Sequence, residues 1–129
     1  MTTKKLTYNE LRILRNEILG LAHVQKDGTQ NIIIVGLKNE DITLGVSHKL
    51  TKIVAKIEEE FKILDISLKE IKGGEQDPVA LVKREELWKQ ELEFVFEPIE
   101  FSKIEDLTPR KNYLGEKFNY EFLIKTICE

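Results

Sequence analysis

The sequence predicts an α+β fold made of a long helical hairpin, a docked N-terminal helix and a small antiparallel β-sheet. Three observations lead to this prediction. Apolar residues follow a heptad repeat over 50–71, a glycine pair and an Asp-Pro helix start come directly after it, and two short segments, 31–37 and 94–101, have strand character. With 129 residues the chain has the length of one domain, 1–129.

A first helix is predicted at 8–22, because both its start and its buried face are recognisable. Thr7 and Glu10 have the spacing of a capping box, in which each side chain accepts a hydrogen bond from the other residue's backbone N–H. The apolar stripe recurs at steps of three and four residues, and its members are Leu11, Leu14, Ile18 and Leu21.

The segment after this helix predicts a turn and a strand. Asp27-Gly28 favours a tight reversal. The β-branched run at 31–37 is typical of a strand, and its continuous apolar character implies burial on both faces or an interface. Residues 42–46 leave two alternatives open, because Gly45 weakens both: a second strand in a hairpin with 31–37, or the lead-in to the next helix.

A long amphipathic helix is predicted at 47–72. Its heptad seam, spaced alternately by four and three residues, consists of Leu50, Val54, Ile57, Phe61, Leu64, Leu68 and Ile71. Gly73-Gly74 ends this helix. Asp77 as N-cap and Pro78 at the first helical position then begin a second helix at 78–92. The short link makes the two helices antiparallel neighbours.

The last third of the chain predicts an edge strand, short turns and a final helix. Apolar and acidic residues alternate over 94–101, and Pro98 confines such a strand to the edge of a sheet. Residues 102–107 predict one helical turn, and 108–112 predict a loop. The apolar spacing over 118–128 favours a helix, with a terminal strand as the alternative.

Four short segments follow the capped N-terminal helix in a characteristic order. They are Ser-His-Lys-Leu-Thr-Lys at 47–52, Lys-Ile-Glu-Glu-Glu-Phe at 56–61, Glu-Leu-Glu-Phe-Val-Phe-Glu-Pro-Ile at 91–99 and Ile-Glu-Asp-Leu at 104–107. This order resembles a family of small, uncharacterised proteins of tailed bacteriophages. The resemblance implies a phage or prophage origin and a role in the host cytoplasm or in the virion. The family carries no established activity, so no residue role is transferred.

Composition narrows the classes of function. The chain has 20 Lys and Arg against 23 Asp and Glu, and the resulting net charge of −3 disfavours a general nucleic-acid coat. The single cysteine, Cys128, cannot form a disulfide within the chain, which fits a reducing cytoplasm. The longest apolar run, 32–35, is too short for a signal peptide or a membrane span, so we expect no membrane association.

No arrangement of residues predicts catalysis, a metal or a cofactor, and we expect a protein that is not an enzyme. His23 and His48 lie on different predicted elements, without the spacing of a zinc site. The glutamates at 58–60 lack the Glu-x-x-His pattern of carboxylate metal centres. Gly73-Gly74 has no phosphate-loop pattern around it, and Cys128 stands in a poor position for a nucleophile.

One basic and aromatic neighbourhood is a candidate site for an anion or a small nucleotide. Arg110, Lys111, Tyr113 and Tyr120 combine cations with aromatic faces on which a base can stack. Acidic neighbours such as Glu116 dilute the charge, and a loop next to core aromatics is the other interpretation. In functional terms this site predicts a phage anti-defence protein that sequesters a host nucleotide signal. Inhibition of a host defence protein is a second form of that hypothesis.

Two apolar features predict contacts between chains. The seam over 50–71 and the strand residues Ile32, Ile33, Ile34 and Val35 present more apolar surface than a small chain readily covers alone. The seam is either an internal core against helices 8–22 and 78–92 or a subunit interface. We favour a homo-oligomer, and with it a non-enzymatic phage accessory or assembly protein that acts through protein–protein contacts with its own copies or with a host or phage protein.

Overall fold

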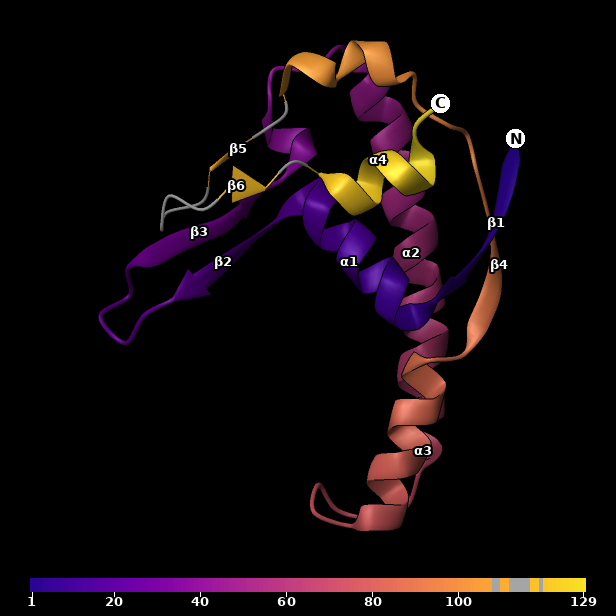
Figure 1. Cartoon of the computed structure of the whole chain (residues 1–129). Helices are drawn as coiled ribbons and strands as arrows, with labels where there is room; N and C mark the ends of the chain where they lie inside the picture. The colour runs from indigo at the N-terminus through magenta and orange to yellow at the C-terminus, as the bar shows by residue number, and fades with distance from the viewer. Residues whose placement is uncertain (108–109, 112–116, 119) are drawn as a thin grey trace.

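Helix α2 (Leu44–Glu70), 27 residues long, is the spine along which the other elements are arranged (Figure 1). The computed structural model describes residues 1–107, 110–111, 117–118 and 120–129, without the side chains of 23, 30, 32, 33, 107, 110, 111, 117 and 118. Within this part the chain has four α-helices and three separate antiparallel strand pairs. The predicted α+β class is therefore confirmed, whereas the strands form isolated pairs instead of one small sheet.

The hydrophobic core lies between the first two thirds of α2 and the layer that covers it. That layer contains helix α1 (Tyr8–Leu19), helix α4 (Glu121–Ile127) and a strand pair. The fully buried side chains of the core come from all of these elements, and they include Leu11, Leu14, Ile18, Leu50, Ile57, Phe96, Ile99, Leu123 and Ile127. One ion pair, Arg15 Nε to Glu58 Oε1 at 2.6 Å, joins α1 to α2 at the edge of this core.

Helix α1 begins as the sequence predicts and ends earlier. Both hydrogen bonds of the Thr7–Glu10 capping box are present. Gly20 stops the helix, because its φ of 94° lies in a region that side-chain-bearing residues rarely adopt. Leu21 therefore does not belong to the buried stripe of α1. It lies, partly exposed, in the next strand.

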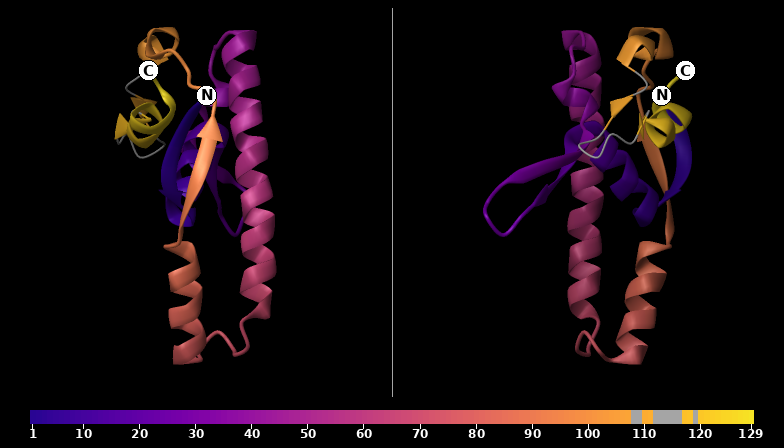
Figure 2. Two further views of the ribbon diagram at one scale, coloured as in Figure 1. Left: turned by 90° about the vertical axis from the view of Figure 1, so that its right-hand side faces the viewer. Right: turned by 60° about the vertical axis from the view of Figure 1, so that its left-hand side comes forward.

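Strand β2 (Gly20–Val24) pairs with strand β3 (Gln30–Val35) in an antiparallel hairpin that projects from the body (Figures 1 and 2). The register shifts between Leu21 and Ala22, as at a β-bulge. The predicted strand at 31–37 thus pairs with 20–24 within the chain. Of the two alternatives for 42–46, the strand is wrong and the lead-in is confirmed, because Thr43 caps α2 and Leu44 begins it.

Strand β1 (Thr2–Thr7) pairs antiparallel with strand β4 (Glu91–Phe96), from Thr2 opposite Phe96 to Thr7 opposite Glu91. The predicted edge strand over 94–101 is confirmed in its first part and ends before Pro98, whereas β1 was not predicted. The outer edge of β4 lies beside α2 (Figure 2). There Lys56 Nζ donates to the carbonyl of Val95 at 2.7 Å, so a helix side chain satisfies one acceptor on the free edge.

The C-terminal segment closes the body over α1. The predicted helical turn at 102–107 is confirmed as two 3₁₀ turns, Phe101–Lys103 and Glu105–Leu107. Strands β5 (Arg110–Lys111) and β6 (Lys117–Phe118) form the third pair, and most of the predicted loop at 108–112 lies outside the described residues. For 118–128 the helix alternative is confirmed by α4. The N–H of Ile99 donates to the carbonyl of Ile127, which ties the chain end to the segment after β4.

Helix α3 (Pro78–Trp88) runs back along the distal part of α2, so the predicted helical hairpin is confirmed (Figure 2). Asp77 caps it as predicted, through Oδ1 and the N–H of Val79 at 3.0 Å. The helix ends at Trp88 instead of 92, because Glu91 already belongs to β4. Phe61 of α2 and Trp88 pack with ring centroids 6.2 Å apart, close to the point where the hairpin leaves the body.

A close contact between Gly20 and Gly36 fixes where the β2–β3 hairpin leaves the body. A Cβ added at Gly36 would overlap the backbone of Leu19 and Gly20, which cannot move without displacing α1. We expect Gly36→Ala to lower the free energy of unfolding by about 1–3 kcal/mol, measured by urea denaturation.

Gly45→Ala is the matched control, since nothing lies within 4 Å of its added Cβ in helix α2. It should leave stability unchanged or raise it by up to about 1 kcal/mol. Equal losses from both variants would contradict the close contact.

Candidate protein interaction surface

The predicted heptad seam lies along α2 and packs mainly against its own chain. Leu50, Ile57 and Leu64 are buried in the core. The remaining members are only half-buried, and they are Val54, Phe61, Leu68 and Ile71. The area that remains accessible to another molecule lies toward the distal end, where α3 is the main cover. This distal part of the hairpin is the first candidate surface.

The predicted interface strand Ile32–Val35 lies in β3. Its main chain pairs with β2 in the same chain, and Ile34 and Val35 are half-buried. The side chains of Ile32 and Ile33 are outside the described set. The apolar run is thus placed on the projecting hairpin, and its role as an interface stays a prediction.

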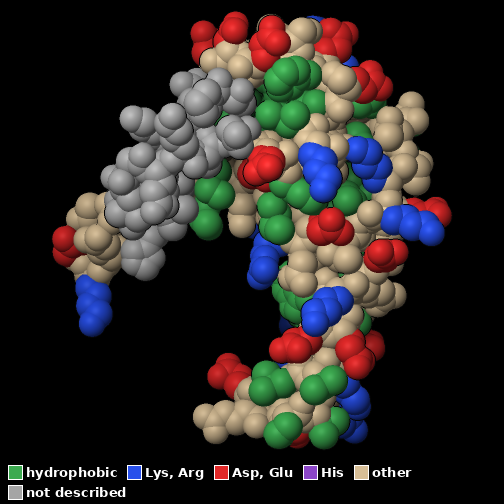
Figure 3. Space-filling model, viewed as in Figure 1, with side chains coloured by type: hydrophobic (Ala, Val, Ile, Leu, Met, Phe, Trp, Pro, Cys, Tyr) green, Lys and Arg blue, Asp and Glu red, His purple; other side chains and the backbone are tan. Residues whose placement is uncertain are grey.

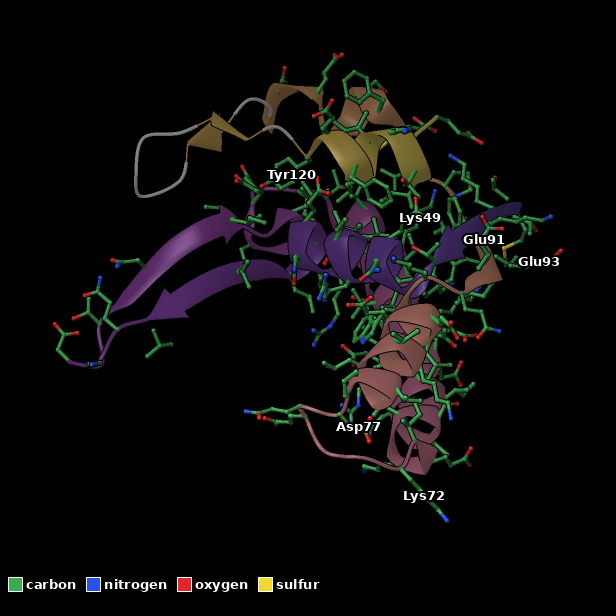
Figure 4. The ribbon with its side chains drawn as sticks, turned by 60° about the horizontal axis from the view of Figure 1, so that its bottom comes forward. Lys49, Lys72, Asp77, Glu91, Glu93 and Tyr120 are labelled. Atoms are coloured by element: carbon green, nitrogen blue, oxygen red, sulfur yellow. The ribbon has the colours of Figure 1, made fainter. Side chains whose placement is uncertain are left out.

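The candidate nucleotide residues are not brought together in the described part of the chain. Tyr120 is buried, 1% exposed, and its hydroxyl donates to the carbonyl of Val35 at 2.6 Å (Figure 4). Its ring therefore offers no open face on which a base could stack. Arg110 and Lys111 form β5 with undescribed side chains, and Tyr113 lies outside the described residues. The nucleotide hypothesis stays a prediction that the described geometry does not support.

Helix α3 has an unusual balance of buried and exposed side chains. Ala80 is its one fully buried residue, and it lies against Gly73 of the loop between α2 and α3. Val79 is 64% exposed and Val82 54% exposed, because helical spacing turns both of them away from the side on which Ala80 lies. Leu81 is also exposed. The space-filling view shows apolar side chains gathered at this end of the hairpin (Figure 3). Val79 and Val82 are three positions apart and lie on one side of the helix, and we call them the apolar face of α3.

Two adjoining grooves accompany this face. The larger, of about 640 Å³, lies between α2 and α3, with Ile71 and Leu87 among its lining residues. The smaller, of about 430 Å³, lies on α3 itself, against Val79 and Val82. Lys83 and Glu86 line both grooves, so these two charged side chains form the ridge between them.

The loop that joins α2 to α3 is held by several hydrogen bonds. The guanidinium of Arg84 donates to the carbonyls of Gly73 at 2.8 Å and Gly74 at 3.3 Å. Asp77, at the start of α3, caps the helix from the other side of this loop (Figure 4). Lys72 points away from the hairpin in the same view. These hydrogen bonds tie Gly73 and Gly74 to α3.

Residues with catalytic or metal-binding chemistry are dispersed. No three His, Cys, Asp or Glu of the described residues lie close enough to hold a metal ion. His48 is exposed on α2, and the side chain of His23 is not described. Burial raises the pKa of the Cys128 thiol to about 11, which keeps it protonated near neutral pH. A further groove, of about 310 Å³, has Lys49 and Lys56 in its wall, but both ammonium groups already contact main-chain carbonyls near β4.

Comparison with known proteins finds no match to a family model, to a curated protein or to a solved structure. The helices that the structure describes include none with the length and apolar character needed to cross a bilayer. The key feature of the candidate surface, the outward apolar face of α3, was not separated from the core by the sequence pattern. The signal that could have found it is Ala80, the small residue that is the one fully buried position of α3.

One buried carboxyl has a consequence for stability. Glu17 of α1 lies under α4, where its Oε1 accepts from the N–H of Leu123 at 3.4 Å. Burial raises the pKa of Glu17 to about 7, against opposing hydrogen bonds from the N–H groups of Leu123 and Phe122, and the charge of Glu121 adds to the rise. Folding thus makes Glu17 bind its proton more tightly than in the unfolded chain.

The free energy of unfolding should therefore fall as the pH rises from about 4.5 to about 7, by up to about 3 kcal/mol, because the unfolded state releases this proton first. In Glu17→Gln the amide keeps an acceptor for Leu123 and cannot ionise. Urea denaturation at several pH values should show a flatter profile for this variant and higher stability at pH 8. Glu59→Gln, at an exposed position of α2, should keep the wild-type slope. An unchanged slope in Glu17→Gln would contradict the assignment.

Proposed function

We propose that this protein acts without catalysis, as an accessory or assembly protein, through contacts between protein surfaces, and that it forms a homo-oligomer. The observation that carries the proposal is the apolar face of α3. Besides Ala80, the helix buries Leu87 and Trp88 only in part. Its exposed valines and Leu81 therefore add little to the stabilisation that helices in proteins gain from packing.

The apolar exposure is concentrated on the distal hairpin. On the outer side of α2 the same region exposes Ile63 and Ile66. Single exposed apolar residues are normal on a protein surface, whereas a cluster on one projecting element marks an interaction site. The projection itself favours this use, because the body does not cover the end of the hairpin (Figure 1). The order of segments that resembles small phage proteins supports a setting in the infected host cell or the virion.

The proposal predicts a mass that depends on protein concentration. Light scattering on a sizing column, from micromolar to millimolar protein, should show a multiple of 15.0 kDa at the upper end. The double variant Val79→Thr/Val82→Thr keeps side-chain shape and loses apolar area. It should raise the dissociation constant about tenfold or more, since about 1.4 kcal/mol of lost burial suffices.

Val95→Thr is the matched control, because Val95 is an exposed valine on β4, away from the hairpin end. It should leave the mass profile unchanged. A wild-type protein that stays at 15.0 kDa at every concentration would overturn the homo-oligomer. Oligomers that persist in the double variant would move the interface to another surface, such as the β2–β3 hairpin.

A further inference from the structure

A lysine-lined groove lies between α2 and the end of the β1–β4 pair, where α2 runs beside β4 (Figure 2). Its volume of about 310 Å³ is at the lower end of the range for small-molecule sites. It shares no lining residue with the two grooves of the hairpin. Among its described lining residues one carboxylate, Glu97, stands against three lysines of α2, which are Lys49, Lys52 and Lys56. The groove is therefore locally positive, in a chain whose net charge is −3.

The main chain of the strand segment holds two of these lysines in place. Lys49 Nζ donates to the carbonyl of Pro98 at 3.4 Å, and Lys56 Nζ donates to the carbonyl of Val95 at 2.7 Å. Each contact uses one of the three N–H donors of an ammonium group, so both lysines keep donors for a ligand. Glu97 Oε1, 3.7 Å from Lys49 Nζ, offsets part of the charge of that lysine. The groove thus contains positive charge that is already positioned.

Lys52 lies between these two lysines along α2 and has no anionic partner. Its side chain makes no hydrogen bond or ion pair with the part of the chain that the structure describes. The helix positions three and four residues away from it carry no acidic side chain, and they are occupied by His48, Lys49, Ala55 and Lys56. Like charges four positions apart, as in Lys52 and Lys56, repel and slightly destabilise a helix. A bound anion would remove this repulsion.

We propose that the groove binds a small organic phosphate, whose phosphate group contacts Lys52 between the two positioned lysines. Three lysines against one glutamate leave an excess of two positive charges in the lining. A phosphate monoester matches this excess, because it carries close to two negative charges at neutral pH. Lysine also suits the group, since its ammonium binds phosphate as a point charge and needs no planar match.

The apolar part of the lining favours an organic ligand over the bare ion. Met1 and Ala55 line the groove and are exposed, whereas Ile53 and Phe96 are themselves buried. The exposed side chains, together with the methylene stems of the lysines, offer apolar surface to a ligand. Burial of about 60 Å² of such surface is enough for a tenfold gain in affinity.

An NMR titration of the ¹⁵N-labelled full chain with phenyl phosphate tests the site. At about pH 7.5, where the phosphate is a dianion, and in low salt we expect saturable binding with a dissociation constant of about 1 mM or below. The amide signals that shift should come from residues 49–56 and 96–97. Inorganic phosphate lacks the ring, and benzoate has the ring with one charge. Each should bind at least about threefold more weakly.

Two variants test the charge of the groove. Lys52→Ala removes the lysine without a partner and should raise the dissociation constant about fivefold. Its midpoint of urea unfolding should stay the same or rise, because the variant removes a repulsion and introduces a strong helix former. Ala55→Glu keeps all three lysines and places a carboxylate at the groove, so it should weaken binding to a similar extent. Neither position makes a side-chain bond that the fold needs.

Lys62→Ala is the matched control, because Lys62 is an exposed lysine of the same helix that does not line the groove. It should bind phenyl phosphate as the wild type does. Absence of saturable binding to the wild-type chain would overturn the site, and equal affinity for inorganic phosphate would overturn the organic ligand. Wild-type affinity in Lys52→Ala, or equal weakening in Lys62→Ala, would overturn the assignment to this groove. The mass profile that tests the homo-oligomer depends on none of these results.

Discussion

The packing of α2 against the rest of its own chain is the constraint on which the structure depends. Over its first half the helix is buried along two rows of side chains, with Leu50 and Ile57 in one and Val46 and Ile53 in the other. Helix α1, the β1–β4 pair and α4 all converge there, and the Arg15–Glu58 ion pair joins α1 to the same helix. Over its second half Leu64 is the one buried side chain, and α3 is the main cover. The same heptad pattern thus packs against several elements in the body of the protein and mainly against one helix, α3, in the distal hairpin.

The elements that local chemistry specifies could be predicted from the sequence, and those that need a distant partner could not. The Thr7–Glu10 capping box, the seam of α2 and the Asp77-Pro78 start each depend on residues a few positions apart. Strand β1 depends instead on β4, about 90 residues away, and its own sequence is polar apart from Leu6, without the alternation typical of a strand. The predicted helix at 8–22 includes the first three residues of β2, because Leu21 continues the helical spacing. Only the backbone of Gly20, at positive φ, ends the helix before it.

The burial of side chains at the candidate surface also depends on distant parts of the chain, so it could not be predicted from the sequence. The sequence predicts a helix at 78–92 that packs on the long helix, but it does not say how much of this helix the long one covers. That depends on tertiary packing: the one fully buried residue of α3 is Ala80, which is too small to bury much area, whereas Leu87 and Trp88 are half-buried. In the same way, Tyr120 resembles a ligand-binding aromatic in the sequence. In the fold it lies in the core, where its hydroxyl donates to Val35.

A weak interface can still be specific when its surface is formed before the partner arrives. The loop of the hairpin is held by Arg84 on the carbonyls of Gly73 and Gly74, and Asp77 caps α3 from the start of that helix. The groove therefore does not have to be ordered on binding, and the entropic cost of association is correspondingly lower. Lys83 and Glu86 line both grooves, so a protein bound at the proposed surface would meet one cation and one anion there.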